Sequence, residues 1–155
     1  MNDSLKAKLI AAGLTAALPL VMFFEGLVTQ TYVDPVGIPT ACYGYTGKDL
    51  HAGQKFTEGQ CQDLLADKLL EANQAIDGCV AVSLTDNQRS AFVSFAYNVG
   101  GGAFCRSTMA RKLNTRDFRG ACDELLRWTY AGGKQLPGLV KRRQAEHSLC
   151  LKGPV

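Results

Sequence analysis

The longest uninterrupted apolar stretch of the sequence covers residues 9–24 and contains no charged side chain. Two lysines precede it, an order typical of the charged and apolar regions of an export signal. The stretch is shorter than the roughly 20 apolar residues that a transmembrane helix needs, and its glycine, threonine and proline make it only weakly hydrophobic. Two interpretations remain open: residues 1–24 act as an export signal or anchor, or they form an N-terminal helix buried in the core.

Short β-rich pieces follow at residues 30–33 and 40–45, and glycines and prolines between residues 26 and 47 punctuate them. Turn-forming residues at this spacing around short strands are typical of β-hairpins. The pattern therefore predicts a small β lobe over residues 25–50.

From Thr57 onward the apolar positions follow the helical repeat. Thr57 with Gln60, and Thr85 with Gln88, form the Thr-x-x-Gln pattern of a capping box, which predicts a helix start at each site. The second of these helices is expected to run to about Tyr97, before consecutive glycines end it. Further helices are predicted over residues 107–113, 115–128 and 139–149. The order of elements predicts an α+β fold in which a larger helical lobe, residues 57–150, follows the β lobe.

Composition limits the choice of function. A chain of 155 residues with 46% hydrophobic residues suits a single domain with a continuous core. Its formal net charge of +3 is too small for the concentrated basic surface of a dedicated nucleic-acid binder, although it still favours anionic polymers such as a bacterial wall. We therefore expect a monomeric domain that binds no nucleic acid.

Six cysteines are spread over the chain without the short paired spacings of a zinc site, and His51 and His147 have no partner cluster. We therefore expect no metal and no other cofactor, and disulfide bonds formed in an oxidising compartment. Six cysteines allow fifteen connectivities, so the sequence alone does not determine the pairs. We expect sequence neighbours, which lie about one hairpin or helix unit apart, to be joined. These pairs are Cys42–Cys61, Cys79–Cys105 and Cys122–Cys150.

Two carboxyl residues have contrasting surroundings. Glu25 directly follows two phenylalanines at the expected end of the first helix, where aromatic neighbours would remove water from a carboxyl and help it to keep its proton. Asp34 lies in a turn rich in glycine and proline, a more solvated place in which a carboxyl stays ionised. Glycoside hydrolysis needs such a pair, because one carboxyl protonates the departing sugar oxygen while the other activates water or stabilises the transition state.

A series of short motifs runs from residue 24 to residue 149. In chain order the main ones are Glu25-Gly26, Tyr32-x-Asp34, Gly37, Thr40, Tyr43-Gly44-Tyr45-Thr46-Gly47, Ser94-Phe95-Ala96-Tyr97-Asn98-Val99-Gly100, Arg111-Lys112-Leu113-Asn114, Arg127-Trp128, Pro137-Gly138-Leu139 and Arg142-Arg143. In this order they resemble the T4-type phage lysozyme family. Several motifs in the right order are far more specific than any one of them.

The resemblance implies three catalytic roles: Glu25 as the general acid, Asp34 as the carboxylate that helps to activate water, and Thr40 as the hydroxyl that positions it. It implies hydrolysis of the β-1,4 bond between N-acetylmuramic acid and N-acetylglucosamine in peptidoglycan, usually with inversion at the anomeric carbon. It also implies a lysozyme-like fold, with the active-site cleft between a β-hairpin lobe and a helical lobe.

Three further residues have both a functional and a structural interpretation. Tyr97 and Ser107 match cleft-lining positions of the family, but core packing and helix capping are at least as good explanations of them. Arg142 matches a family arginine near the catalytic glutamate. The alternative is a solvated helix face that Arg142 and Arg143 share with Glu146.

Two aromatic residues need separate interpretations. Tyr45 stands where many family members have histidine, which affects local stability and cleft polarity rather than the three catalytic roles. Trp128 is the only tryptophan, and its helical spacing from Leu125 favours a core position over a sugar-stacking platform.

The cysteine-rich body is similar to signal-anchor-release endolysins, which are held inactive in the inner membrane until they are freed. This resemblance implies export to the periplasm, host-cell lysis and transient membrane association through residues 9–24. A spacer usually separates membrane segment and glutamate in those proteins, whereas here Phe24 abuts Glu25. Insertion into a bilayer would then disturb the site, so the membrane form should be inactive. No cysteine lies in residues 9–24, so a disulfide exchange started from the anchor is not expected.

Three other functions remain as alternatives. A lytic transglycosylase cuts the same bond without water and needs only the acid, so Asp34 and Thr40 argue against it. A catalytically silent wall-binding module would not need Glu25, Asp34 and Thr40 together. A membrane-active lytic protein would act through its apolar N-terminus alone.

Overall fold

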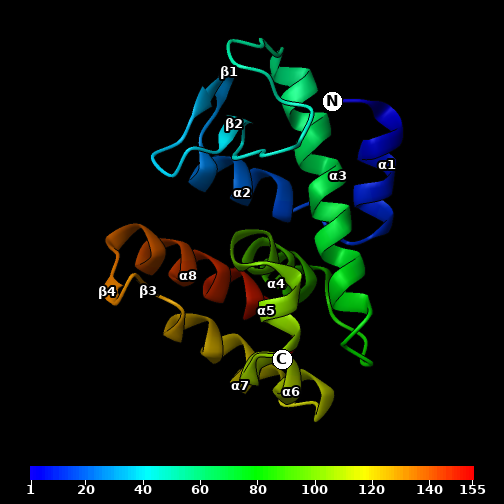
Figure 1. Ribbon diagram of the computed structural model, residues 1–155. Helices are drawn as coiled ribbons and strands as arrows, with labels where there is room; N and C mark the ends of the chain where they lie inside the picture. Colours follow the sequence, from blue (N-terminus) through cyan, green and yellow to red (C-terminus); the bar gives the residue numbers. More distant parts are fainter.

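The structure, a computed structural model, describes residues 1–155. In chain order its elements are α1 (Asp3–Ala11), α2 (Ala17–Glu25), β1 (Val28–Val33), β2 (Pro39–Cys42), α3 (Glu58–Asp77), α4 (Asp86–Val99), α5 (Gly101–Cys105), α6 (Thr108–Asn114), α7 (Phe118–Glu124), the 3-10 helix η1 (Leu125–Arg127), β3 (Tyr130–Ala131), β4 (Lys134–Gln135) and α8 (Pro137–Cys150). The strands β1 and β2 form a small lobe, and the long helix α3 runs from it to the larger helical lobe (Figure 1). This arrangement confirms the predicted α+β fold.

The apolar stretch at residues 9–24 forms parts of two short helices rather than one continuous helix. The chain breaks after α1 at Gly13, which has a φ of +71° that glycine adopts readily. The missing side chain also lets the backbone approach α4, since a Cβ at Gly13 would lie 2.5 Å from the carboxylate of Asp86. The stretch contributes to the core through Leu9, Leu14, Ala17 and Val21, which are buried. None of the helices combines the length and the hydrophobicity needed to span a bilayer.

The β lobe is an antiparallel hairpin of β1 and β2 in which Tyr32 pairs with Thr40. The strand predicted over residues 40–45 ends earlier, at residue 42. Beyond it the chain reverses, so that Ala41 forms a bridge with Tyr45. Gly44 permits the reversal with a φ of +77°. The loop after β2 therefore folds back toward the end of α2.

Both predicted capping boxes are present and begin α3 and α4, with Thr57 and Thr85 accepting hydrogen bonds from backbone N–H groups of the first turn. The helix predicted over residues 115–128 begins later, because Asp117 caps α7 by accepting from the N–H of Gly120. The helix predicted over residues 139–149 begins earlier, because Pro137 fits the first turn of α8.

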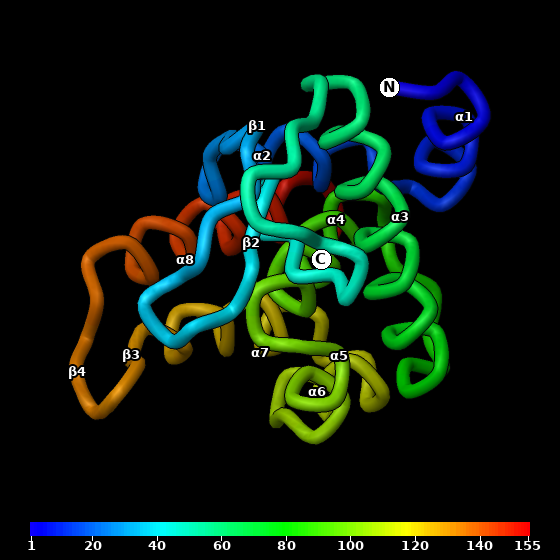
Figure 2. Tube along the Cα trace, turned by 45° about the horizontal axis from the view of Figure 1, so that its top comes forward, coloured from blue at the N-terminus to red at the C-terminus, as the bar shows by residue number.

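The short helix α5 and the β3–β4 hairpin have no counterpart in the sequence prediction. Consecutive glycines end α4 as expected, but the short helix α5 starts among them. Gly132 and Gly133, expected only to separate two helices, form the turn of the β3–β4 hairpin with positive φ angles. This hairpin and the β1–β2 turn project on the same side of the molecule (Figure 2).

Helix α4 lies at the centre of the helical lobe and packs against α3 and α8. Its residues 91–96 are all buried. Trp128 packs edge-on against Phe95, with ring centroids 5.1 Å apart, and adjoins the core cluster. The core interpretation of Trp128 is therefore confirmed.

The predicted disulfide connectivity is also confirmed. Cys42–Cys61 ties the end of β2 to the first turn of α3. Cys79–Cys105 ties the chain beyond α3 to α5, and Cys122–Cys150 joins α7 to α8. One of the three bonds therefore connects the two lobes directly beside the reversal at Gly44.

Candidate active site

Glu25 is the last residue of α2, where the chain leaves the helix toward the first strand. It lines a cavity of about 540 Å³ whose other walls come from the loop after β2 and from α3, α4 and α5. The other charged residues of this lining are Lys68 and Glu71, which pair with each other at 2.8 Å. The side chain of Glu25 is 22% exposed. The carboxyl is thus sheltered by protein but accessible to a ligand in the cavity between the lobes.

The backbone of Gly44 packs closely against the carboxylate of Glu25. A Cβ atom at Gly44 would lie 3.1 Å from Oε2 of Glu25. This close approach and the positive φ both favour glycine at this position. The reversal after β2 therefore forms one wall of the pocket around the carboxylate.

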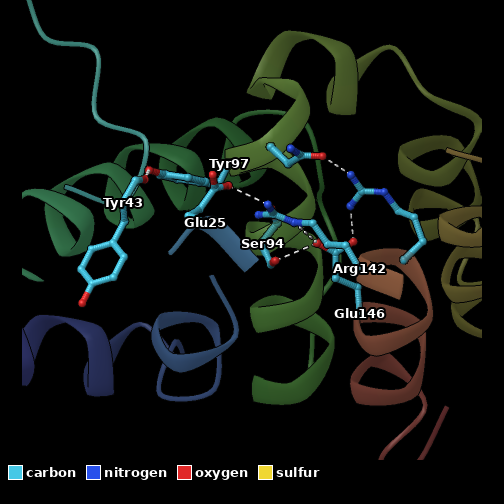
Figure 3. A network of polar contacts seen from close by, with 8 residues as sticks. Glu25, Tyr43, Ser94, Tyr97, Arg142 and Glu146 are labelled. Carbon is cyan, nitrogen blue, oxygen red and sulfur yellow. Dashed lines mark hydrogen bonds and ion pairs between the residues drawn. The ribbon is translucent and has the colours of Figure 1, made fainter. Parts of the chain in front are cut away.

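Arg142 on α8 is the direct partner of Glu25, to whose Oε1 its Nη1 donates at 2.6 Å (Figure 3). The Arg142 side chain is only 5% exposed, and its guanidinium lies 5.8 Å from the ring centroid of Phe24. Low exposure strengthens such a charged contact, because little water screens it. The structure thus brings together the two residues that the sequence matched to a family glutamate and a nearby arginine.

A buried polar network extends from Arg142 into the core (Figure 3). The Glu146 carboxylate accepts from Nε of Arg142 at 3.3 Å and from the hydroxyl of Ser94 at 2.7 Å. Arg143 donates to the other oxygen of Glu146 and to the side chain of Asn98. Arg142, Arg143 and Glu146 are all buried. The interpretation of Arg142, Arg143 and Glu146 as a solvated helix face is therefore wrong, and the four-residue spacing of Arg142 and Glu146 was the signal for their contact.

Tyr97 lies on the cavity wall, and its hydroxyl donates to the backbone carbonyl of Tyr43 at 2.5 Å. Burial raises the pKa of the Tyr97 hydroxyl above its ordinary value, and the negative charge of Glu25 raises it further. The hydroxyl therefore remains a hydrogen-bond donor that ties α4 to the loop after β2.

The side chains of Asp34 and Thr40 both form hydrogen bonds with the backbone of Ile38. Asp34 Oδ1 accepts from the N–H groups of Val36 and Ile38, at 3.0 and 2.8 Å, and so shapes the turn between the strands. The hydroxyl of Thr40 donates to the carbonyl of Ile38 at 3.1 Å. The hairpin thus places both side chains at one end of its strands, with Asp34 Oδ2 free of hydrogen bonds within the protein.

The cavity that contains Glu25 is not lined by every predicted site residue. Asp34, Thr40 and Ser107 do not contribute to its wall. Ser107 is buried and caps α6, since its hydroxyl accepts from the N–H of Ala110 at 3.2 Å and donates to the carbonyl of Phe104 at 2.6 Å. The structure therefore shows that Ser107 caps α6. A contact between Ser107 and substrate stays a prediction.

The aromatic surroundings expected for Glu25 are only half present. Phe24 is partly buried beside Arg142, whereas Phe23 is 80% exposed. Consecutive residues of a helix point in directions about 100° apart, so both rings cannot face the same pocket. The expectation was therefore wrong for Phe23.

Tyr45, the departure from the family pattern, forms part of the cavity wall. Its hydroxyl donates to Oδ1 of Asp49 at 2.8 Å, and this hydrogen bond raises the pKa of Tyr45 from its ordinary value. The tyrosine hydroxyl therefore has a hydrogen-bond partner within its own loop.

No group of three or more His, Cys, Asp or Glu side chains is arranged to hold a metal ion. His51 is exposed, and His147 contacts Asp123 at 2.8 Å.

Comparison with known proteins agrees with this geometry. The sequence pattern of the phage lysozyme family matches residues 22–146. The SAR-endolysin of Bacteriophage PS119 is 47% identical over 129 residues, which cover 83% of this chain and 77% of that protein. The muramidase domain of SpmX from Asticaccaulis excentricus superposes with a TM-score of 0.83 at 33% identity, over 90% of this chain and 97% of that one. A mutant of P22 lysozyme gives a TM-score of 0.81 at 34% identity, over 89% and 97%.

The protein is a glycoside hydrolase of the muramidase class with a lysozyme-like fold. These similarities and the carboxyl in the cavity between the lobes define it as such. The chain belongs to the phage lysozyme family, whose substrate is peptidoglycan. The family predicted from the sequence motifs is thereby confirmed.

Proposed function

We propose that this muramidase hydrolyses the β-1,4 bond between N-acetylmuramic acid and N-acetylglucosamine, with Glu25 as general acid and with Asp34 and Thr40 acting on the attacking water. The observation that carries the proposal is the position of Glu25, a partly exposed carboxyl that faces the cavity between the lobes while Arg142 holds it. A proton donor must reach the glycosidic oxygen directly, and Glu25 is the one carboxyl in this lining that has a buried cationic partner.

In the proposed step Glu25 transfers its proton to the glycosidic oxygen as the bond to the departing sugar breaks. The carboxylate that remains is stabilised by the guanidinium of Arg142, which is already in place at hydrogen-bond distance. Because Arg142 is buried and oriented, little rearrangement accompanies the appearance of negative charge. This preorganisation favours proton transfer out of Glu25.

The proposed water-activating group is the pair Asp34 and Thr40. Asp34 uses Oδ1 to hold its own turn, and Oδ2 remains to accept a proton from water. Thr40 lies across the hairpin from Tyr32, and its hydroxyl oxygen can accept a hydrogen bond while its proton is donated to Ile38. A water held between these two side chains would attack the anomeric carbon from the face opposite Glu25, which gives the inversion that the family resemblance implies.

Sugar binding is proposed for Tyr97, whose ring forms part of the cavity wall and suits packing on a sugar face. For Ser107 the support is the family match alone, because its hydroxyl is buried and caps α6. Substitution of Tyr97 should therefore affect substrate affinity more than substitution of Ser107 does.

The products of digestion test the proposal. Purified peptidoglycan treated with the protein should yield fragments with reducing N-acetylmuramic acid ends, made by water attack. Fragments ending in an anhydro sugar would instead identify a lytic transglycosylase. Absence of soluble fragments, with the protein bound to the wall, would indicate a catalytically silent binding module.

We also propose that the protein is an exported, monomeric endolysin that associates transiently with the inner membrane through residues 9–24 and then lyses the host. Relatives named SAR-endolysins support this, including those of Bacteriophage PS119 and Enterobacteria phage P21. Leu14 and Val21 are buried in the fold, so a segment held in the bilayer would leave the core incomplete and the protein inactive. Fractionation should find the activity in the released fraction; a membrane-bound fraction with full activity would contradict the proposal.

A further inference from the structure

We infer that Glu146, a fully buried carboxylate on α8, is a positioning residue that offsets the charge of Arg142 and so helps Glu25 to keep the proton it donates. The inference rests on the proposed role of Glu25 as general acid. A general acid must be protonated before the bond breaks, whereas a guanidinium at hydrogen-bond distance favours the carboxylate form. The effect of Arg142 on the protonation of Glu25 must therefore be offset by a nearby negative charge.

Arg142 lies between two carboxylates and is held from three sides. Nη1 faces Glu25 at 2.6 Å, Nε faces Glu146 at 3.3 Å, and Nη2 donates to the backbone carbonyl of Ser94 at 3.3 Å. The guanidinium cannot turn further toward Glu25 without giving up Glu146. Glu146 thus orients the Arg142 guanidinium and also partly neutralises its positive charge.

Glu146 is surrounded by hydrogen-bond donors despite its burial. Its two oxygens accept from Ser94, Arg142 and Arg143, and hydrogen bonds from charged donors favour the carboxylate. Two guanidiniums and one carboxylate leave a single net positive charge beside Glu25. If Glu146 were neutral, the positive charges of both guanidiniums would be uncompensated, and the ionised form of the acid would be favoured more strongly.

On α8 and the elements packed against it, Lys141, Asp86 and Arg119 are exposed and form no ion pair, and the other charged groups are paired. Burial keeps the Tyr97 hydroxyl on α4 protonated by raising its pKa. The remaining pairs are Arg89 of α4 with Asp77, His147 with Asp123 of α7, Glu124 with Lys112 and with Arg127 of η1, and Lys68 with Glu71 across the cavity. All of these groups, including His147, are unchanged in every variant below.

The test compares the pH profiles of kcat/KM for two variants that remove opposite charges. Glu146→Gln should move the alkaline limb to lower pH by about one unit, which is about a tenfold loss of activity on that limb. Arg143→Met removes a positive charge from the same network and should move the limb to higher pH. A merely structural defect lowers the rate at every pH and moves neither limb.

Two controls keep the test decisive. Glu146→Asp retains the charge and should leave the limb near its original position, even if the rate falls. The double variant of Arg143→Met with Glu146→Gln removes one charge of each sign, so its limb should return toward that of the unsubstituted protein. If Glu146→Gln does not fold, Arg143→Met alone still tests the inference, because its limb is expected at higher pH than that of the unsubstituted protein and an unchanged limb would overturn it.

The outcomes separate this inference from the proposed function. If Glu25→Gln retains activity, the assignment of the acid is wrong. If Glu25→Gln is inactive and the limbs of folded Glu146→Gln and Arg143→Met coincide with that of the unsubstituted protein, only the role of Glu146 is overturned.

Discussion

Arg142 donates a hydrogen bond to Glu25 at 2.6 Å across 117 positions of sequence. The contact joins the last helix of the chain to the end of α2. It places one buried guanidinium between a carboxyl in the cavity and a second carboxylate, Glu146, in the core. The proposed acid is therefore held by the helical lobe as well as by its own helix.

The first prediction concerns stability. Arg142→Met should lower the free energy of unfolding by about 3 kcal/mol, because it removes a buried partner from both Glu25 and Glu146. Urea denaturation measures the change. Lys68→Met, which breaks a largely exposed pair, is the control and should cost less than about 1 kcal/mol. Equal losses in the two variants would mean that burial adds nothing to the Arg142 contacts.

A matched pair of glycine variants tests the approach of the loop to the acid. Gly44 and Gly133 have φ angles of +77° and +76°, but only a Cβ at Gly44 would meet Glu25, at 3.1 Å. Both alanine variants should lose about 1 kcal/mol of stability from backbone strain. Only Gly44→Ala should lose activity, by roughly tenfold or more, because it displaces the carboxyl. Similar activities in the two variants would show that the contact is unimportant.

The disulfides give a third comparison. Cys42–Cys61 and Cys122–Cys150 close loops of similar length, with separations of 19 and 28 residues. Replacing either pair by serines should therefore cost a similar stability of about 3 kcal/mol. Loss of Cys42–Cys61 should reduce kcat more at a temperature where both variants are folded, since it frees the strand that leads to Gly44. Equal kcat values would argue against this link.

The fourth prediction is a pH effect at Tyr97. The pKa of its hydroxyl is raised in the folded protein, so the folded state keeps a proton that the unfolded chain releases. This contribution to stability is complete below about pH 10 and is lost as the pH rises above it. Tyr97→Phe should cost about 1 kcal/mol at neutral pH, from the hydrogen bond to Tyr43, and should weaken the decline in stability at alkaline pH. The exposed variant Tyr130→Phe should do neither.

Local signals in the sequence predicted much of the fold. The capping residues Thr57 and Thr85 determine helix starts by contacts within one turn, so the pattern alone locates them. The hairpin and the sequence-neighbour disulfides are likewise short-range features. Glu25 stood out because two aromatic residues precede it, although only Phe24 proved to be near the carboxyl's partner.

The rest depended on contacts between distant parts of the chain. The break at Gly13 follows from its close approach to Asp86 of α4, which no local pattern encodes. The charged residues Arg142, Arg143 and Glu146 have the composition of a solvated face, yet they are buried because they satisfy one another and Glu25. A buried charge network and an exposed charged face have the same sequence pattern.

Glu25→Gln tests most directly whether Glu25 donates the proton, because it keeps the side-chain size and removes the proton donor. The measurement is the loss of turbidity of outer-membrane-permeabilised Gram-negative cells, with the folded state checked by thermal melting. Glu58→Gln, an exposed substitution outside the cavity, is the matched control. We expect Glu25→Gln to abolish lysis while Glu58→Gln lyses normally. Lysis retained by folded Glu25→Gln would contradict the account and direct attention to the apolar N-terminal segment.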